Sequence, residues 1–225
     1  EEHNLLRSTR LKEVRPGQTI TLGSMKVEFI RITHSIPDAC ALAIHTPVGT
    51  IVHTGDFKID YTPIDGEIID LGRLAALGNK GVLALMSDST NAERKGYTMS
   101  ESTVGDILDK LFVNCTKRIV VATFSSNVHR VQQIVNSAVK YKRKVAVCGR
   151  SMCNMIETAR KFGYIKVPDN VFIDIDSIKS YPDDSLVIIT TGSQGEPMSA
   201  LTRMASGEHR KVQITPNDLI IISAN

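Results

Sequence analysis

Long apolar runs, cysteine pairs and segments of biased composition are absent from this sequence. No apolar run approaches the roughly 20 residues of a membrane-spanning helix, and no basic segment followed by an apolar stretch indicates a secretory signal. The four cysteines form no CxxC pair, which favours a reducing, cytoplasmic setting over a disulfide framework. An apolar content of 42% and a charged content of 23% exclude disorder and collagen-like repeats.

Charge is distributed unevenly along the 225 residues. Residues 1–78 carry 8 Lys and Arg against 10 Asp and Glu, whereas residues 79–225 carry 19 against 14. A basic part attached to an acidic part is a mild indication of a polyanionic partner. Scattered, solvated charge explains the same numbers equally well.

The first part of the chain has the alternation of β-strands. Residues 18–22 and 25–32 alternate apolar and polar side chains, with Gly23 and Ser24 between them. Residues 39–45 and 50–54 repeat this pattern around a Thr-Pro-Val-Gly turn. Two hairpins in succession predict antiparallel β structure.

From about residue 80 the pattern changes to strands that are apolar on both faces, alternating with helices. Helical spacing occupies 101–113, 127–141 and 152–162, and Pro197 and Gly207 bracket a fourth helix. The short apolar runs are 82–86, 119–124, 145–148, 171–175, 186–191 and 219–223. Such alternation predicts right-handed crossovers and a doubly wound, mostly parallel α/β sheet. We place the boundary near 75–80, which divides the chain into domains 1–78 and 79–225.

Two side chains near strand ends in the first part could hold a metal ion. His34 follows the strand at 25–32, and Asp56 follows the strand at 50–54, 22 residues later. Neighbouring strands would bring an imidazole and a carboxylate to one edge of the sheet, and both groups are suitable zinc ligands. A histidine that is merely hydrogen-bonded at a strand end is the more common arrangement. No HxH or HExxH pair supplies the further ligands that a catalytic zinc needs.

Three strand-to-helix corners in the second part could bind phosphate. Hydroxyl, amide and free backbone N–H groups at a helix start form an anion pocket, although the same residue types cap helices in every α/β fold. Because the strands before them are expected to be parallel, the corners should converge on one sheet edge. The residues concerned are Ser125, Ser126 and Asn127 in the first corner, Gly149, Arg150 and Ser151 (as the cap) in the second, and two glycines and two hydroxyls of TTGSQGEPMS (190–199), Ser193 among them, in the third.

One more carboxylate, Asp88, lies at a strand end in the string LMSDSTNAE. It could orient a histidine or a metal ligand. Capping of its own loop is an equally good interpretation.

Taken in order, these strings resemble the ribonuclease J family of bacteria from about residue 11 onward. They are THSIPDA, TGDFKID, LMSDSTNAE, ATFSSNVHR, CGRSM and TTGSQGEPMSAL. That family belongs to the metallo-β-lactamase superfamily, in the group with an inserted β-CASP domain. The resemblance implies a partial metallo-β-lactamase sheet in 1–78 and a β-CASP domain, incomplete at its C-terminal end, in 79–225.

The resemblance also implies a function and its site residues. It implies a cytoplasmic, zinc-dependent ribonuclease with both 5′-to-3′ exonuclease and endonuclease activity. Its substrate would be RNA, 5′-monophosphorylated RNA in particular, and its role would be in rRNA processing and RNA decay. Two zinc ions would stabilise the charge on the attacking and leaving oxygens. His34 matches a zinc ligand, Asp56 the carboxylate that bridges both metals, and Asp88 the acidic residue that opens the β-CASP motif series. Phe124, Ser125 and Ser126 match a segment that contacts RNA.

The family's HxHxDH motif and its later β-CASP histidine motifs do not occur in this sequence. We therefore expect a fragment of the parent enzyme, one that binds zinc weakly or not at all and has little nuclease activity. Besides RNA, the partners we consider are further copies of the chain and other proteins of RNA decay, and we expect no membrane partner.

Two other functions compete with the enzyme. The first is a module that binds RNA or protein without catalysis, which RNA binding in chelator would reveal. The second is a metallo-β-lactamase-type hydrolase of a small molecule. The second is disfavoured because a large α/β insertion with three phosphate-type corners would have no use there.

Overall fold

The computed structural model describes residues 8–224 of the chain, which form two compact units. Unit 1 comprises residues up to His34 together with Asp38–Tyr61 and Glu67–Thr98. Unit 2 comprises Ser35–Pro37, Thr62–Gly66 and the chain from Met99 onward. Each unit has its own sheet, and each is described by itself below.

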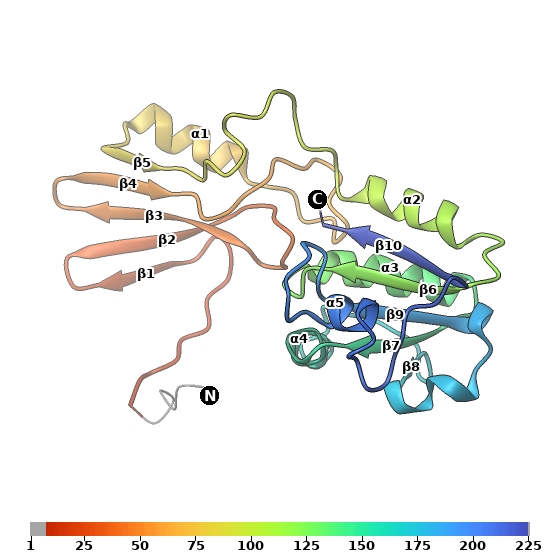
Figure 1. Ribbon diagram of the computed structural model, residues 1–225. Helices are drawn as coiled ribbons and strands as arrows, with labels where there is room; N and C mark the ends of the chain where they lie inside the picture. The colour runs from red at the N-terminus through yellow and green to blue at the C-terminus, as the bar shows by residue number, and fades with distance from the viewer. Residues whose placement is uncertain (1–7, 225) are drawn as a thin grey trace. The chain divides into compact units, whose positions relative to one another are not determined.

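Unit 1 is built on a five-stranded sheet in the order β1-β2-β3-β4-β5 (Figure 1). The predicted antiparallel hairpins are confirmed, because β1 pairs with β2, β2 with β3 and β3 with β4 in antiparallel register. Gly23 has a φ of 60° in the two-residue turn between β1 and β2. The strands are β1 (Thr19–Leu22), β2 (Met25–Arg31), β3 (Cys40–Thr46), β4 (Gly49–His53) and β5 (Ala84–Met86).

A helix that the sequence pattern did not predict, α1 (Leu71–Lys80), packs against this sheet. Two glycines within ten residues weaken its helical signal, since glycine is a poor helix former. Asp70 caps the helix by accepting the backbone N–H of Arg73 at 2.8 Å. The Arg73 side chain binds the buried carboxylate of Glu28 at 2.6 and 2.8 Å, which joins α1 to β2.

Unit 2 contains the predicted parallel sheet, with strands in the order β10-β6-β9-β7-β8. All its strand pairs are parallel, as α/β crossovers require. Its strands are β6 (Arg118–Thr123), β7 (Lys144–Cys148), β8 (Phe172–Ile173), β9 (Leu186–Thr190) and β10 (Asp218–Ser223). Its helices are α2 (Ser102–Phe112), α3 (Val128–Lys140), α4 (Arg150–Lys161) and α5 (Ala200–Ala205), with short 3₁₀ helices at Ile175–Ser180 and Asp183–Ser185.

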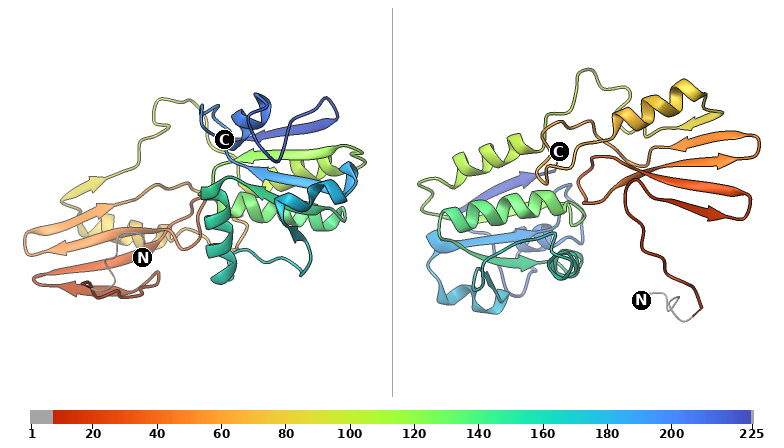
Figure 2. Two further views of the ribbon diagram at one scale, coloured as in Figure 1. Left: turned by 60° about the horizontal axis from the view of Figure 1, so that its bottom comes forward. Right: turned by 180° about the vertical axis from the view of Figure 1, so that it is seen from behind.

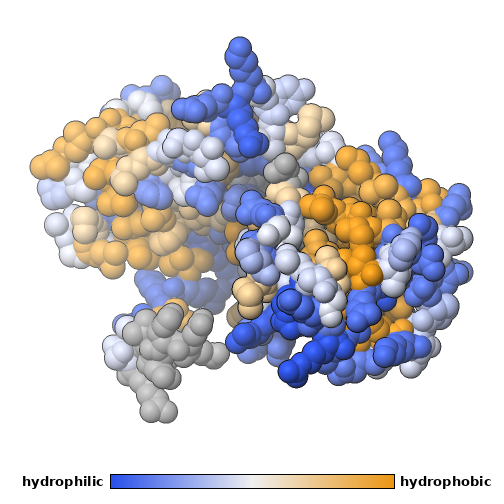
Figure 3. Space-filling view, in the orientation of Figure 1, coloured by the Kyte–Doolittle hydropathy of each residue, from blue (hydrophilic) through white to orange (hydrophobic). Residues whose placement is uncertain are grey.

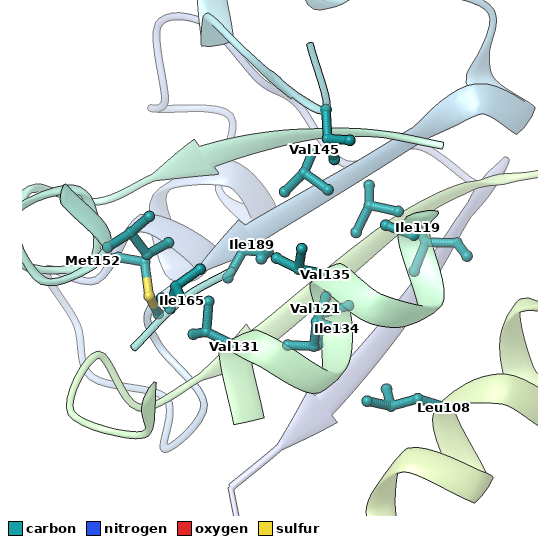
Figure 4. Packing of buried hydrophobic residues seen from close by; sticks show 14 of the residues in the cluster. Leu108, Ile119, Val121, Val131, Ile134, Val135, Val145, Met152, Ile165 and Ile189 are labelled. Carbon is teal, nitrogen blue, oxygen red and sulfur yellow. The ribbon is translucent and has the colours of Figure 1, made fainter. Parts of the chain in front are cut away.

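Apolar side chains cover both faces of this second sheet, which explains why its strands are continuously apolar. One face packs against α2, α3 and α4, and the other packs against α5 and the first 3₁₀ helix (Figure 2). Figure 4 shows the first layer, where Val131, Ile134 and Val135 of α3 lie over Val121 and Ile189 of the sheet. Two apolar layers make unit 2 a doubly wound α/β domain. Within the described residues, no helix is both long and apolar enough to span a membrane.

The structure corrects the assignment of residues 82–86. The run was predicted to belong to the second part, but its last three residues form β5, which pairs with β4 of unit 1. The boundary expected near 75–80 falls inside α1, and the compact units divide after Thr98. A short apolar run cannot by itself reveal which sheet it joins, because the pairing partner is decided by tertiary contacts.

Three smaller expectations at element ends also differ from the structure. The fourth helix begins at Ala200 with Ser199 as its cap, three residues after Pro197. The strand predicted over 171–175 is limited to Phe172–Ile173, because the chain then turns into the 3₁₀ helix. Gly149 rather than Ser151 caps α4, and Ser151 lies exposed in its first turn.

Candidate functional site

Three acidic or imidazole side chains follow strands that end at one edge of unit 1. Strands β2, β4 and β5 run in the same direction, because β3 is antiparallel to β2 and β4, and β5 is parallel to β4. His34 follows β2, Asp56 follows β4 and Asp88 follows β5. The expectation that His34 and Asp56 come from directly neighbouring strands is wrong, since β3 lies between β2 and β4.

Backbone contacts beyond the strand ends draw these segments together. Thr33 and Lys58 form an antiparallel bridge in which the Lys58 N–H donates to the Thr33 carbonyl at 2.8 Å. The Thr33 hydroxyl donates to the Lys58 carbonyl. The Asp88 N–H donates to the Thr54 hydroxyl oxygen at 2.9 Å. These bonds fix the chain directly before His34, on both sides of Asp56 and at Asp88 itself.

The Asp88 carboxylate is stabilised in its charged form. The Thr90 hydroxyl donates to it at 2.7 Å and the Thr90 N–H at 2.9 Å, and these two bonds are the main reason that the pKa of Asp88 lies below its ordinary value. The Phe57 N–H and the charge of His34 lower the same pKa further. His34 and Asp88 are therefore close enough to interact, at the edge where Asp56 is exposed to solvent.

The donors at this edge have the chemistry of zinc ligands but not the number. A catalytic zinc takes about three protein ligands. Across residues 8–224, no three His, Cys, Asp or Glu side chains gather into a set that could hold a metal ion. His34 and Asp56 can contribute an imidazole and a carboxylate, and the described residues do not complete a site around them.

In unit 2, the three corners lie at a single sheet edge. Strands β6, β9 and β7 are consecutive neighbours in the sheet and are parallel, so their carboxyl ends lie side by side. The chain leaves these ends at Phe124, Thr191 and Gly149. In doubly wound sheets this edge is where ligands bind.

The first corner is organised by Asn127. Its side chain accepts the Arg130 N–H at 2.9 Å and so caps α3. Phe124 and Ser125 are half-buried, Ser126 is exposed and Asn127 is buried. The Asn127 side-chain oxygen is thus occupied by the helix cap, while Ser126 is exposed to solvent at the helix start.

Glycines bring the second and third corners into contact. A Cβ at Gly149 would lie 3.0 Å from the Thr191 hydroxyl, and a Cβ at Gly192 would lie 2.3 Å from the Ser199 hydroxyl. In the described part of the chain, the buried Ser193 hydroxyl has no hydrogen-bond partner, nor does that of Thr123 at the end of β6. Unpaired buried hydroxyls are uncommon and indicate groups that can accept or donate to a ligand.

Sequence reasoning missed two polar networks near these corners. The Arg130 guanidinium is buried and binds Glu101 at 2.6 Å, and it also donates to the Ser223 hydroxyl at the end of β10. His209 lies against Cys148, with Nε2 and Sγ 3.0 Å apart. Neither network has a local signal, because its members are 29 to 93 residues apart in the sequence.

Comparison with known proteins finds similarity to ribonuclease J along the whole chain. A family model described as "Ribonuclease J, beta-CASP domain" matches residues 116–225. The protein named Ribonuclease J from Synechocystis sp. is 53% identical over 226 residues, which cover 100% of this chain and 35% of that protein. Ribonuclease J of a Helicobacter pylori strain is 52% identical over 100% of this chain and 33% of its own length. Ribonuclease J2 of Bacillus subtilis is 46% identical over 99% of this chain and 40% of its own.

A solved structure has a similar fold at low sequence identity. The crystal structure of a protein of unknown function from Enterococcus faecalis V583 matches 96% of this chain and 57% of its own, with a TM-score of 0.59 and 17% identity. The chain thus spans about a third of the length of the first curated relatives that it matches. With identity near 50% along its whole length and a β-CASP match within unit 2, this chain is similar throughout to a part of the ribonuclease J proteins.

Proposed function

We propose that this chain is the part of a zinc-dependent ribonuclease that grips the RNA backbone and supplies two of the metal ligands. The observation that carries the proposal is the convergence of three hydroxyl-rich corners on one edge of the parallel sheet in unit 2. Relatives named ribonuclease J support RNA as the polymer and hydrolysis of its phosphodiester bonds as the reaction.

Unit 2 would hold the RNA by its phosphates. The corner residues are Phe124, Ser125, Ser126, Asn127, Ser151 and Ser193. At such corners, N–H groups at helix starts and free hydroxyls donate to phosphate oxygens. Unit 2 from Met99 onward carries 16 Lys and Arg against 12 Asp and Glu, which adds attraction that does not depend on base sequence.

Unit 1 would contribute His34 and Asp56 to a metal centre whose remaining ligands lie outside the described residues. Zinc in such a site supplies Lewis-acid stabilisation of the charge that develops on phosphoryl oxygens. Asp88 would remain a charged acceptor beside His34 at neutral pH, because hydrogen bonds from Thr90 lower its pKa. We extend the proposal to 5′-to-3′ exonuclease and endonuclease activity in the cytoplasm, including rRNA processing.

A binding experiment tests the role of the corners. Affinity for single-stranded RNA is measured in chelator for the wild-type chain, for Ser126→Asp at the corner and for Ser24→Asp in an exposed turn of unit 1. A carboxylate at residue 126 would repel phosphate at the helix start, so we expect about a tenfold loss there and no change for Ser24→Asp. Equal affinities of the two variants would contradict the proposed corner site.

A turnover experiment tests the metal part. The 225-residue chain is mixed with zinc or manganese and a 5′-monophosphorylated RNA, and release of nucleotides is followed. We expect little turnover, because the described residues bring fewer than three metal donors together. Rapid turnover that disappears in His34→Ala would contradict this expectation and would assign a complete centre to the chain.

An RNA-binding module without catalysis is the second candidate function. It is favoured by the same lack of a three-donor set among residues 8–224. An RNA affinity that is the same in chelator and in zinc and that His34→Ala leaves unchanged, combined with no turnover in any metal, is the outcome that would support it. Loss of RNA binding in chelator would support a metal-dependent site instead.

A further inference from the structure

A polar cavity lies at the opposite edge of the sheet in unit 2, where β6 and β9 begin. It has a volume of about 470 Å³, and its lining includes Arg118, Lys179, Tyr181, Asp183, Arg210 and Lys211. Arg118 is the first residue of β6, and the two 3₁₀ helices before β9 supply Lys179 and Asp183. Figure 3 shows hydrophilic residues at the right-hand end of unit 2, where these strands begin. None of these side chains belongs to the corners.

The four cations of this cavity differ in what already neutralises them. Arg118 is held by both oxygens of Asp218 at 2.6 and 2.7 Å, and it donates to the Gln213 carbonyl at 2.8 Å. Lys211 binds Asp176 at 2.7 Å. Within the described residues, the exposed side chains of Lys179 and Arg210 have neither a hydrogen bond nor an ion pair.

An anionic ligand suits this balance of charges. Two unpaired cations stand against one lining carboxylate without an ion pair, Asp183. A phosphate could accept hydrogen bonds from the Arg210 guanidinium and the Lys179 ammonium together. The walls are mainly polar and charged, which does not suit an apolar ligand.

We propose that this amino-edge cavity is a second RNA contact, which binds backbone phosphates at a distance from the corners. The inference depends on the proposed function in taking RNA as the polyanion. Strand β6 has six residues, and at about 3.3 Å per residue it separates the two edges by about 20 Å. A stacked strand places one phosphate about every 3.4 Å, so the two contacts would be about six nucleotides apart.

This separation predicts an effect that depends on RNA length. Affinities are measured by fluorescence anisotropy in chelator for 3′-labelled oligouridines of about 4 and about 16 nucleotides. The variant is Lys179→Ala with Arg210→Ala. Its matched control is Lys110→Ala with Lys166→Ala, which removes two exposed cations of unit 2 that lie outside the cavity.

The longer RNA should lose about tenfold in affinity for the cavity variant at physiological salt, with a salt slope lower by about 1.4, because two phosphate contacts are removed. The short RNA should bind the cavity variant and the wild type equally, since it reaches the corners alone. Asp183→Asn should strengthen binding of the longer RNA. The control should change neither affinity by more than about twofold.

Other outcomes separate the two proposals. If the wild-type chain binds neither RNA, the proposed function fails. If it binds both RNAs but the cavity variant and the control have the same affinity for the longer RNA, the cavity is not a second RNA contact and the proposed function stands. If a polyglutamate peptide displaces the longer RNA from the wild type but not from the cavity variant, the cavity recognises acidic peptides, and the RNA assignment is overturned.

Discussion

At the scale of single residues, a buried charge in unit 2 provides hydrogen bonds to the backbone. Arg143 is 3% exposed, yet within the described residues it has no carboxylate partner. Its guanidinium donates to the carbonyls of Lys117 at 2.9 Å and Leu186 at 3.2 Å, and also to that of Cys115. One side chain therefore satisfies the backbone before β6 and at the start of β9, where sheet hydrogen bonds are incomplete.

We expect Arg143→Met to destabilise the chain by about 2–4 kcal/mol, because the buried Leu186 carbonyl and the partly buried carbonyls of Lys117 and Cys115 would lose their donor. Lys142→Met, next to it and exposed, should change stability by less than about 0.5 kcal/mol. Urea unfolding followed by circular dichroism measures both. Equal midpoints for the two variants would show that the Arg143 bonds contribute nothing net.

His209 makes the stability of unit 2 sensitive to pH. Its Nδ1 accepts the N–H groups of Lys211 at 3.3 Å and Val212 at 3.1 Å, so Nε2 carries the proton and donates to Cys148. Burial lowers the pKa of His209 below its ordinary value, and the charges of Arg203 and Lys211 lower it further. The fold therefore favours the neutral ring.

The sign of the pH effect follows from this shift. The unfolded chain takes up the proton first as pH falls, so the contribution of His209 is complete above about pH 6.5 and is lost as the pH falls through the lower folded value. His209→Asn retains an acceptor at the Nδ1 position without titrating. The loss of unfolding free energy between pH 7.5 and pH 5 should be smaller in the variant, and equal losses would contradict the assignment.

At the scale of elements, the corner after β9 depends on a glycine. Gly192 has a φ of 110°, and an added Cβ would lie 2.3 Å from the Ser199 hydroxyl and 2.9 Å from the Cβ of Leu201. Ser199 caps α5, so the turn, the cap and Ser193 form one packed unit. Backbone conformation and close packing both require glycine here.

We expect Gly192→Ala to cost about 3 kcal/mol, from a strained φ and a clash with the cap together. Gly195→Ala in the same loop has a φ of 74° and open space around its Cβ position, so strain alone should cost about 1 kcal/mol. Thermal unfolding of both variants measures the difference. A cost at residue 192 no larger than at 195 would mean that the loop relaxes freely.

At the scale of the whole molecule, the two units differ in how well they are packed. Unit 2 has apolar layers on both faces of its sheet. In the part of unit 1 that the structure describes, there is one smaller cluster, and a cavity of about 380 Å³ is lined by Ile32, Val52, Leu74 and Val82 among others. All three residues of β5 are exposed, and apolar surface covers much of this unit in Figure 3. Fewer buried contacts make local opening easier.

Hydrogen exchange should therefore separate the units. We expect the amides of β6 and β9 to exchange last and those of β5 to exchange among the first, because β6 is buried along nearly its whole length. Exchange of the intact chain followed by mass spectrometry of its peptides provides the measurement. Protection of β5 equal to that of β6 would contradict this difference.

The sequence by itself determined the local elements and the fold class. Alternating side chains predicted the hairpins of unit 1, and continuous apolar runs between amphipathic helices predicted the parallel sheet of unit 2. Both signals are local, since they depend on periods of two and 3.6 residues. The family resemblance rested on strings that lie at strand ends, and it is confirmed by the relatives.

Tertiary structure alone decided which strands pair and which side chains meet. The sequence could not assign β5 to unit 1, because its pairing partner is a long-range contact. Nor did it reveal α1, because the two glycines of this helix lower its helix propensity and its stability comes from packing on the sheet. Nor could it place Arg143 or His209, whose partners are tens of residues away. Strand order brings His34, Asp56 and Asp88 to one edge in unit 1 and three corners to one edge in unit 2, and strand order is a property of long-range contacts.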